Sequence, residues 1–267
     1  MGRILLVTGG AGFLGRHLLP LAGAGGWVVH APSSAEMDVT HQGRVDAAVA
    51  EVRPDAVVHL AYRMHDTPGI VDGAGNVARA ARAAGARLVH LSTDLVFPGR
   101  DTPYSEEDPP APLHEYGRAK ARAEEVVMTE HPGAVMIRTS ILYGTAHRAP
   151  AQEAVARALE DPASFTFFHD EVRSFTHAGD VAAAVLELVR RREVRGPLHV
   201  AGPEPLDRAE FARRCARWMG GDASVLGSGS GAGGTRPGRV VLDSRRAEAL
   251  GIRCRKVGEG LAGAGAG

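Results

Sequence analysis

Short apolar runs alternate with amphipathic stretches along the first half of the chain. The apolar runs predict strands at residues 3–7, 27–31, 54–61, 87–92 and 134–138. The stretches between them repeat apolar residues at helical spacing and predict helices at residues 13–22, 43–53, 75–84 and 116–130. Because strands and helices alternate as in βαβ units, the pattern predicts an α/β fold with a Rossmann-like, doubly wound parallel sheet.

The pattern is less regular after residue 144 and predicts a small C-terminal α/β lobe. Helices are expected at residues 152–159, 181–191 and 208–219, and strands at 165–168 and 198–200. We expect Asp180 and Asp207 to open two of these helices, because a carboxylate accepts hydrogen bonds from the free N–H groups of a first turn. The expected division is a Rossmann domain at residues 1–145 and 173–192, and a lobe at residues 146–172 and 193–260.

Proline and glycine residues indicate where helices are expected to end and where loops and mobile segments are expected. Pro20 is expected to kink the first helix or to end it early, since proline cannot donate to the helical ladder. The proline-rich loop 98–113 is expected to cover the crevice at the carboxyl end of the fourth strand. The glycine- and serine-rich run 227–234 and the tail 258–267 are expected to be mobile.

A glycine-rich turn follows directly on the first strand. Gly9, Gly12 and Gly15 are spaced Gly-x-x-Gly-x-x-Gly, unlike the Gly-x-Gly-x-x-Gly of the usual dinucleotide fingerprint. Without Cβ atoms the chain can turn sharply and let a pyrophosphate approach its N–H groups, beside the positive end of the following helix. The turn therefore predicts nucleotide binding, and the alternative is a plain strand-to-helix turn.

Composition narrows the class of protein. The 267 residues carry a formal net charge of zero, which argues against a nucleic-acid-binding surface. No apolar run reaches the ~18 residues that span a membrane, and the chain opens on a core strand in place of a signal peptide. We therefore expect a cytoplasmic protein with no membrane partner. Cys215 and Cys254 lie far apart and lack metal-ligand spacing, so free thiols and no metal site are expected.

The end of the second strand bears on the choice of nucleotide. An acid at this position accepts from the ribose 2′-hydroxyl of NAD and repels the 2′-phosphate of NADP. Here the strand runs into Pro32-Ser33-Ser34, and the first acid is Glu36. The sequence therefore favours NADP over NAD, with Ser33, Ser34 and Arg16 as candidate phosphate contacts.

A tyrosine and a lysine four residues apart suggest the chemistry. Tyr116 and Lys120 share one helical face, and Ser92-Thr93-Asp94 ends the fourth strand. A lysine ammonium lowers the pKa of a nearby phenol from about 10, so that the phenol can donate a proton to a carbonyl oxygen as hydride reaches the carbon. A Thr or Ser hydroxyl holds that oxygen. Taken alone, a Tyr-x-x-x-Lys pair is also compatible with a surface helix.

These motifs together resemble the extended short-chain dehydrogenase/reductase superfamily, and most closely its dTDP-4-dehydrorhamnose reductase branch. The resemblance covers roughly the first 190 residues. It rests on the stretches 8–15, 37–40, 53–55, 91–97, 103–108, 116–120 and 137–144.

The resemblance implies roles for the site residues. Tyr116 would be the proton donor, Lys120 its partner and a ribose ligand, and Thr93 the clamp on the substrate oxygen, with Ser92 in that role if the register is shifted by one. The implied cofactor contacts also include Gly9, Gly12, Phe13, Leu14, Gly15, Ser33, Asp38, Val39, Leu60, Ala61 and Ile141. The superfamily commonly forms homodimers.

The implied activity is an NAD(P)H-dependent reduction of the keto group on a nucleotide-activated, dTDP-type 4-keto-6-deoxysugar, bound by the C-terminal lobe. Alternatives are an epimerase or dehydratase of the same superfamily, or a non-catalytic NADP-binding regulatory subunit. The chain departs from the family at Leu95, where tyrosine is usual, at Asp72, and in the shortened segment 62–72.

Further substrate contacts are expected from Ser92, Asp94, His65 and Arg173. The Arg173 guanidinium suits a diphosphate, and a structural role is the alternative. His59 and His90 lie within expected strands and are interpreted as core residues with satisfied hydrogen bonds.

Overall fold

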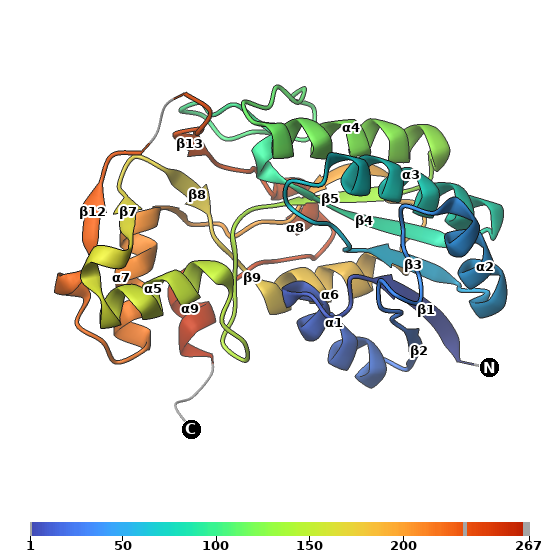
Figure 1. Ribbon diagram of the computed structural model, residues 1–267, viewed down its shortest axis with the longest axis horizontal. Helices are drawn as coiled ribbons and strands as arrows, with labels where there is room; N and C mark the ends of the chain where they lie inside the picture. The colour runs from blue at the N-terminus through green and yellow to red at the C-terminus, as the bar shows by residue number, and fades with distance from the viewer. Residues whose placement is uncertain (1, 232–233, 264–267) are drawn as a thin grey trace.

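The computed structural model describes residues 2–231 and 234–263, and its centre is a six-stranded parallel sheet (Figure 1). The strand order is β10-β5-β4-β3-β1-β2, and every neighbouring pair is parallel. The strands are β1 Arg3–Thr8, β2 Trp27–His30, β3 Ala56–His59, β4 Arg87–Thr93, β5 Val135–Thr139 and β10 Gly196–His199. The predicted doubly wound, Rossmann-like α/β fold is confirmed.

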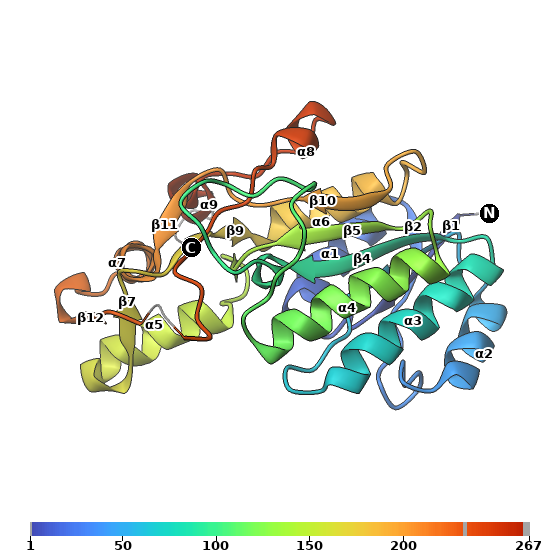
Figure 2. The ribbon, with the colours of Figure 1, turned by 90° about the horizontal axis from the view of Figure 1, so that it is seen from above.

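Helices cover both faces of the sheet (Figure 2). One face packs on α1 Phe13–Ala24 and α6 Ala178–Leu188, and the other on α2 Gln42–Val52, α3 Thr67–Ala83 and α4 Glu115–Glu130. Alternate residues of a strand point to opposite faces, so Leu5 joins the first apolar cluster and Leu6 the second.

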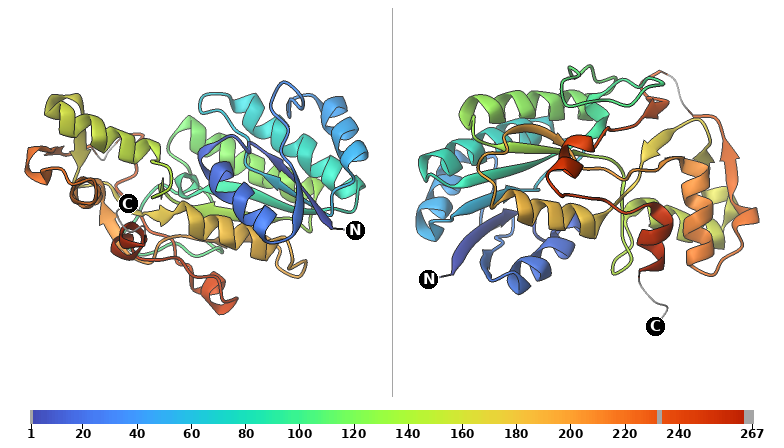
Figure 3. Two further views of the ribbon diagram at one scale, coloured as in Figure 1. Left: turned by 90° about the horizontal axis from the view of Figure 1, so that it is seen from below. Right: turned by 180° about the vertical axis from the view of Figure 1, so that it is seen from behind.

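The smaller lobe is built from short elements on the carboxyl side of the sheet. They are β6 Leu142–Tyr143, α5 Pro150–Glu160, β7 Thr166–Phe168, β8 Val172–Ser174, β9 Thr176–His177, β11 Pro205–Asp207, α7 Arg208–Trp218, β12 Gly227–Gly229, β13 Arg239–Val240 and α9 Val257–Ala262. Phe175 and Phe211 stack at its centre, with ring centroids 3.9 Å apart. Helix α9 lies beside α7 (Figure 3).

Two parts of the expected division are corrected. Residues 196–199, assigned to the lobe from the sequence, form β10, the edge strand of the main sheet beside β5. Helix α8 Arg245–Ala249 packs against β10, and its Ala247 is buried in the apolar cluster of the Rossmann domain.

Several helix boundaries differ from the expected ones. Pro20 does not end α1, because it is exposed and water can satisfy the carbonyl that loses its partner. Helix α3 begins at Thr67, eight residues before the expected start, where the Asp66 carboxylate accepts from the N–H of Gly69. The ring of His177, not Asp180, caps α6. Asp207 caps α7 as predicted.

Two segments expected to be mobile are partly regular. Gly227–Gly229 form β12, which pairs with β7 through backbone hydrogen bonds that need no side chains. The rest of that expectation includes residues 232–233, which lie outside the described residues. Residues 258–262 of the expected tail belong to α9, and residues 264–267 lie outside the described residues.

A buried arginine links several segments at the amino end of the sheet. The Arg87 guanidinium donates to the carbonyl oxygens of Leu188 at 3.1 Å, Gly133 at 2.5 Å and Val194 at 2.6 Å. These oxygens end α6, precede β5 and precede β10. One side chain thus satisfies three carbonyls that would otherwise lack partners.

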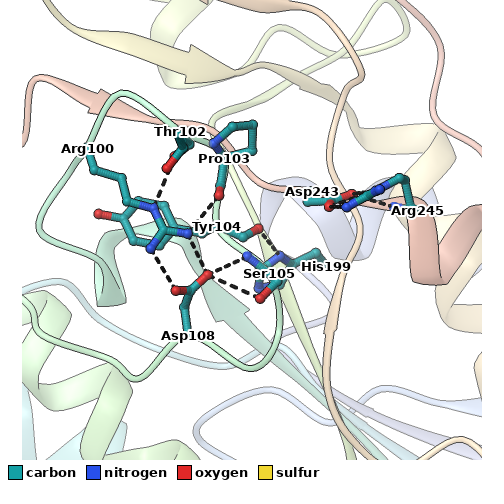
Figure 4. A network of polar contacts seen from close by, with 9 residues as sticks. All are labelled: Arg100, Thr102, Pro103, Tyr104, Ser105, Asp108, His199, Asp243 and Arg245. Carbon is teal, nitrogen blue, oxygen red and sulfur yellow. Dashed lines mark hydrogen bonds and ion pairs between the residues drawn. The ribbon is translucent and has the colours of Figure 1, made fainter.

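Loop 98–113 is fastened to the C-terminal segment (Figure 4). Arg100 donates to both carboxylate oxygens of Asp108, at 2.7 and 2.6 Å, and its guanidinium lies 4.1 Å from the ring centroid of Tyr104. The backbone of Tyr104 exchanges hydrogen bonds with Val241 and Asp243, each 2.8 Å long. The loop is therefore packed against the chain that follows β13.

Candidate active site

A cleft of about 1160 Å³ lies at the carboxyl ends of the strands. This volume exceeds the ~300–1,000 Å³ of an ordinary small-molecule pocket, so the cleft can hold a dinucleotide and a second ligand. It is lined by all the cofactor contacts that the family resemblance implies and by Ser34, together with Ser92, Thr93, Asp94, Tyr116 and Lys120. Arg16, the other candidate phosphate contact, does not line it. Among the described residues, its lining includes none from loop 98–113, so the expectation that this loop covers the crevice is corrected.

The glycine turn forms one end of the cleft. Gly9 has φ +72°, and a Cβ there would lie 2.7 Å from the backbone nitrogen of Ala61. No side chain caps α1 at Gly12, so the N–H groups of its first turn remain available to an anion. A Cβ on Gly15 would meet the backbone of Gly10, so glycine is needed for the helix to approach the turn. These features fit a dinucleotide pyrophosphate.

The segment after β2 lines the adenosine side of the cleft. The backbone N–H and the hydroxyl of Ser33 donate to one Glu36 oxygen, at 2.7 and 2.8 Å. The backbone hydrogen bond from Ser33 lowers the pKa of this exposed carboxyl. The carbonyl of Val39 accepts from the Asn76 amide at 2.9 Å, which holds this wall against α3.

The two hydroxyls at the end of β4 have different partners. Ser92 donates to Glu124 at 2.5 Å, and that carboxylate also forms a buried ion pair with Arg138 at 2.7 Å. Thr93 accepts from the N–H of Leu95 at 3.2 Å and lies at the 3₁₀ turn η1 Asp94–Val96. The Thr93 hydroxyl donates to Asp94 at 3.3 Å, a longer hydrogen bond than that of Ser92, so the geometry favours Thr93 over Ser92 for the substrate oxygen.

Tyr116 lies in the first turn of α4, where the His114 ring accepts from the N–H of Gly117 at 3.0 Å. Burial raises the pKa of Tyr116, and Tyr62 and the Asp94 charge act in the same direction. A hydrogen bond with Thr93 acts in the opposite direction. In the absence of ligands the phenol thus keeps its proton more firmly than the sequence analysis expected.

Lys120 is directed to the floor of the cleft. Its ammonium donates to the carbonyl of Leu91 at 2.6 Å and lies 3.5 Å from Nε2 of His90. Burial lowers the pKa of Lys120 to about 8, and Glu124 opposes that shift. The ammonium is 5.9 Å from the ring centroid of Tyr62.

Asp94 and Arg173 form a buried polar group beside the cleft. Asp94 accepts from the Ser140 hydroxyl at 2.6 Å, and burial raises the pKa of its carboxyl. The Arg173 guanidinium donates to the carbonyls of Val172, Gly238 and Pro237 and does not line the cleft. These partners favour the structural role for Arg173 over the diphosphate contact.

Residues 62–66 form a wall of the cleft in the segment where the sequence departs from the family pattern. His65, a predicted substrate contact, has φ +73° and does not line the cleft, whereas Tyr62, Met64 and Asp66 do. The rings of Tyr62 and Tyr116 are 5.7 Å apart. No sequence motif identified Tyr62 as a site residue. The signal that could have identified it is its position directly after Ala61, a predicted cofactor contact.

Within residues 2–231 and 234–263, no group of three or more His, Cys, Asp or Glu side chains could hold a metal ion. The helices of the described chain are all too short or too polar to cross a membrane. Cys215 and Cys254 are both free thiols.

Comparison with known proteins places the chain in a family. Residues 3–264 match the family model described as RmlD substrate binding domain. The chain is 31% identical to dTDP-4-dehydrorhamnose reductase of Mycolicibacterium smegmatis, covering 94% of this chain and 81% of the relative. It is 30% identical to methionine adenosyltransferase 2 subunit beta of Pongo abelii, covering 94% and 83%.

The solved structures show the same architecture. The crystal structure of dTDP-4-dehydrorhamnose reductase from Bacillus anthracis in complex with NADP superposes with a TM-score of 0.89 at 26% identity, covering 98% of this chain and 96% of that one. The reductases among these proteins agree with the oxidoreductase class that the sequence predicts. The chain therefore belongs to the RmlD substrate-binding domain family of the extended short-chain dehydrogenase/reductases.

Proposed function

We propose that the protein is an NAD(P)H-dependent reductase of the keto group on a nucleotide-activated 4-keto-6-deoxysugar. The observation that carries the proposal is the single cleft that joins the glycine turn to Thr93, Tyr116 and Lys120. One end suits a pyrophosphate, and the other presents a protonated phenol beside a hydroxyl. The reductase relative of M. smegmatis supports the sugar-nucleotide class.

The side chains of the cleft have separable tasks in this reaction. A bound nicotinamide dinucleotide would supply the hydride. The Thr93 hydroxyl orients the substrate oxygen, and Tyr116 transfers its phenolic proton to that oxygen as the alcohol forms. Lys120 places a positive charge where the phenolate develops, and solvent returns the proton to Tyr116 after product release.

We propose NADPH as the preferred cofactor. Ser33 and Ser34 line the cleft after β2, whereas Glu36 does not line it. The Ser33 hydroxyl is bound to Glu36, so Ser34 offers its hydroxyl to a phosphate. Arg44 donates to the carbonyl of Ala35 at 3.3 Å, which brings a positive charge to the same segment. Titration of the intrinsic fluorescence should give a lower Kd for NADPH than for NADH, and tighter binding of NADH would refute this preference.

The activity is tested by following the absorbance of NADPH with a panel of dTDP- and UDP-linked 4-keto-6-deoxysugars. We expect turnover with a dTDP-linked member. Replacing Tyr116→Phe should lower kcat by roughly 10²–10⁴-fold, the usual contribution of a general acid, while the Kd for NADPH stays close to that of the unchanged protein.

The matched control for this variant is Tyr143→Phe. Tyr143 is fully buried in the lobe core and does not line the cleft. Its variant should keep kcat. Full activity of Tyr116→Phe would show that the proton donor is assigned wrongly.

A second candidate is a non-catalytic, NADP-binding regulatory subunit. It is favoured by the relatives named methionine adenosyltransferase 2 subunit beta. Retention of Tyr116 and Lys120 in one cleft supports catalysis instead. Tight NADPH binding without turnover on the whole panel, combined with formation of a stable complex with a methionine adenosyltransferase, would favour the regulatory subunit.

A further inference from the structure

A row of polar side chains crosses the sheet beneath the cleft. Thr8 pairs with His59 in the register of β1 and β3, and His59 pairs with His90 in that of β3 and β4. All three are buried, with each histidine 2% exposed. They lie in one row because residues paired across parallel strands point to the same face.

Hydrogen bonds define the first half of the row. The Thr8 hydroxyl oxygen accepts from the N–H of Ala61 at 3.2 Å and lies 2.7 Å from Nδ1 of His59. The hydroxyl and Nδ1 of His59 therefore share one hydrogen bond, and the tautomer of His59 decides which of the two donates. The rings of His59 and His90 stack with centroids 5.2 Å apart.

The second half of the row reaches Lys120. An ammonium only donates, so its 3.5 Å contact requires that Nε2 of His90 accept and that the His90 proton lie on Nδ1. Burial lowers the pKa of His90 well below its usual value, and the Lys120 charge adds to this effect. The imidazole is therefore neutral and able to accept.

Two of the three N–H bonds of Lys120 are thus directed at the carbonyl of Leu91, which lines the cleft, and at His90, which does not. The third remains for a ligand in the cleft that Lys120 lines. From the sequence, both histidines are expected to be core residues with satisfied hydrogen bonds. Yet Nε2 of His59 and Nδ1 of His90 lack a hydrogen-bond partner among the described residues, so their burial is costly.

We propose that His90, held in place by stacking on His59, is a positioning residue that orients the ammonium of Lys120 toward the cleft. The inference rests on the proposed reductase function. Without this acceptor, the ammonium would keep the Leu91 carbonyl as its one backbone partner and would be free to rotate away from its ligand.

The proposal predicts the sign of a pH effect. The groups that face Lys120 are Glu124 on its own helix, His90 on β4, and Tyr62 from the loop after β3. His59 on β3 is close enough for Lys120 to lower its pKa. A hydrogen bond to the charged form raises the pKa of Lys120, so loss of the His90 acceptor lowers it. The alkaline limb of kcat/KM then moves to lower pH.

The test compares His90→Phe with His90→Gln. Phenylalanine keeps a ring on His59 but removes the acceptor, and glutamine can restore an acceptor near the position of Nε2. We expect His90→Phe to lower kcat/KM roughly tenfold and to move the alkaline limb down by roughly one pH unit. His90→Gln should recover most of both effects.

His199→Phe is the matched control. His199 is a fully buried histidine on β10 that bonds the carbonyl of Tyr104 and does not line the cleft. A merely structural role would make the two phenylalanine variants alike. If His90→Phe does not melt cooperatively, His90→Leu replaces it.

The outcomes separate the two proposals. An unmoved alkaline limb in a folded His90 variant of an active enzyme overturns the positioning role alone. If the unchanged protein does not turn over any substrate, the positioning role is tested by NADPH binding instead. The pH dependence of the Kd for NADPH is then compared between the unchanged protein and His90→Phe. An unchanged dependence overturns the role, and absence of NADPH binding overturns both proposals.

Discussion

Tyr116 and Lys120 differ in how firmly they hold their protons. Burial raises the pKa of the phenol and lowers that of the ammonium to about 8. At neutral pH both groups are protonated, which is the state that a proton-donating tyrosine with a cationic partner requires.

This arrangement predicts a pH dependence. As the pH rises through about 8, Lys120 loses its charge and no longer stabilises the developing phenolate. We therefore expect kcat/KM to be constant between about pH 6 and 7 and to fall tenfold per pH unit above the pKa. A rate profile from pH 6 to 10 checks this, and activity that is constant up to pH 10 would contradict it.

The buried pair Glu124–Arg138 predicts a large stability effect. Both side chains are about 5% exposed or less, so Arg138→Met leaves the buried Glu124 carboxylate without its arginine partner, with the Ser92 hydroxyl still donating to it. We expect a loss of about 3–5 kcal/mol in the free energy of unfolding, measured in urea. Arg122→Met breaks the exposed pair with Glu125 and should cost under ~1 kcal/mol. Similar losses for the two variants would contradict the burial argument.

Among the elements, the strands of the sheet were predicted best. β3 and β5 are short apolar runs whose side chains are buried on both faces, so pattern alone locates them. The start of α3 was missed because Thr67, Pro68 and Gly69 are poor helix formers inside a helix. There the Asp66 cap and the burial of Ile70 outweigh propensity.

In the candidate site, too, the features set by local sequence were predicted and those set by long-range contacts were not. The glycine turn and the Tyr116–Lys120 pair were predicted because their spacing is imposed by local backbone geometry. The sequence left Arg173 open between a diphosphate contact and a structural role, since its acceptors Pro237 and Gly238 are more than 60 residues away. The ring pair of Tyr62 and Tyr116 is likewise a long-range contact.

Helix α1 offers a paired test of the glycine turn. A Cβ at Gly15 would meet the backbone of Gly10, whereas a Cβ at Gly23, on the exposed side of the same helix, has nothing within 4 Å. Gly15→Ala should lose about 1–3 kcal/mol of stability and most of its NADPH affinity. Gly23→Ala should be neutral or gain up to ~1 kcal/mol. Equal thermal melting curves for the two variants would refute the packing argument.

For the whole molecule, a ligand in the central cleft should stabilise the fold. The cleft is lined by the ends of β1, β3, β4 and β5, so its occupant contacts most of the sheet. At about 100 times Kd, NADPH contributes about 2.7 kcal/mol, which raises Tm by roughly 5–10 °C in a chain of this size. Differential scanning fluorimetry measures this shift. A larger shift with NADH at equal concentration would contradict the preference for NADPH.

The Arg87 cluster has a consequence for how this protein can change. It binds the end of α6 and the starts of β5 and β10 at the edge of the sheet opposite the cleft. Substitutions around the cleft therefore leave these links intact, and the stability they provide can absorb the cost of new side chains. Residues 62–66 are thus a suitable place for a randomised library aimed at new substrates, whereas Arg87 should be kept constant in it.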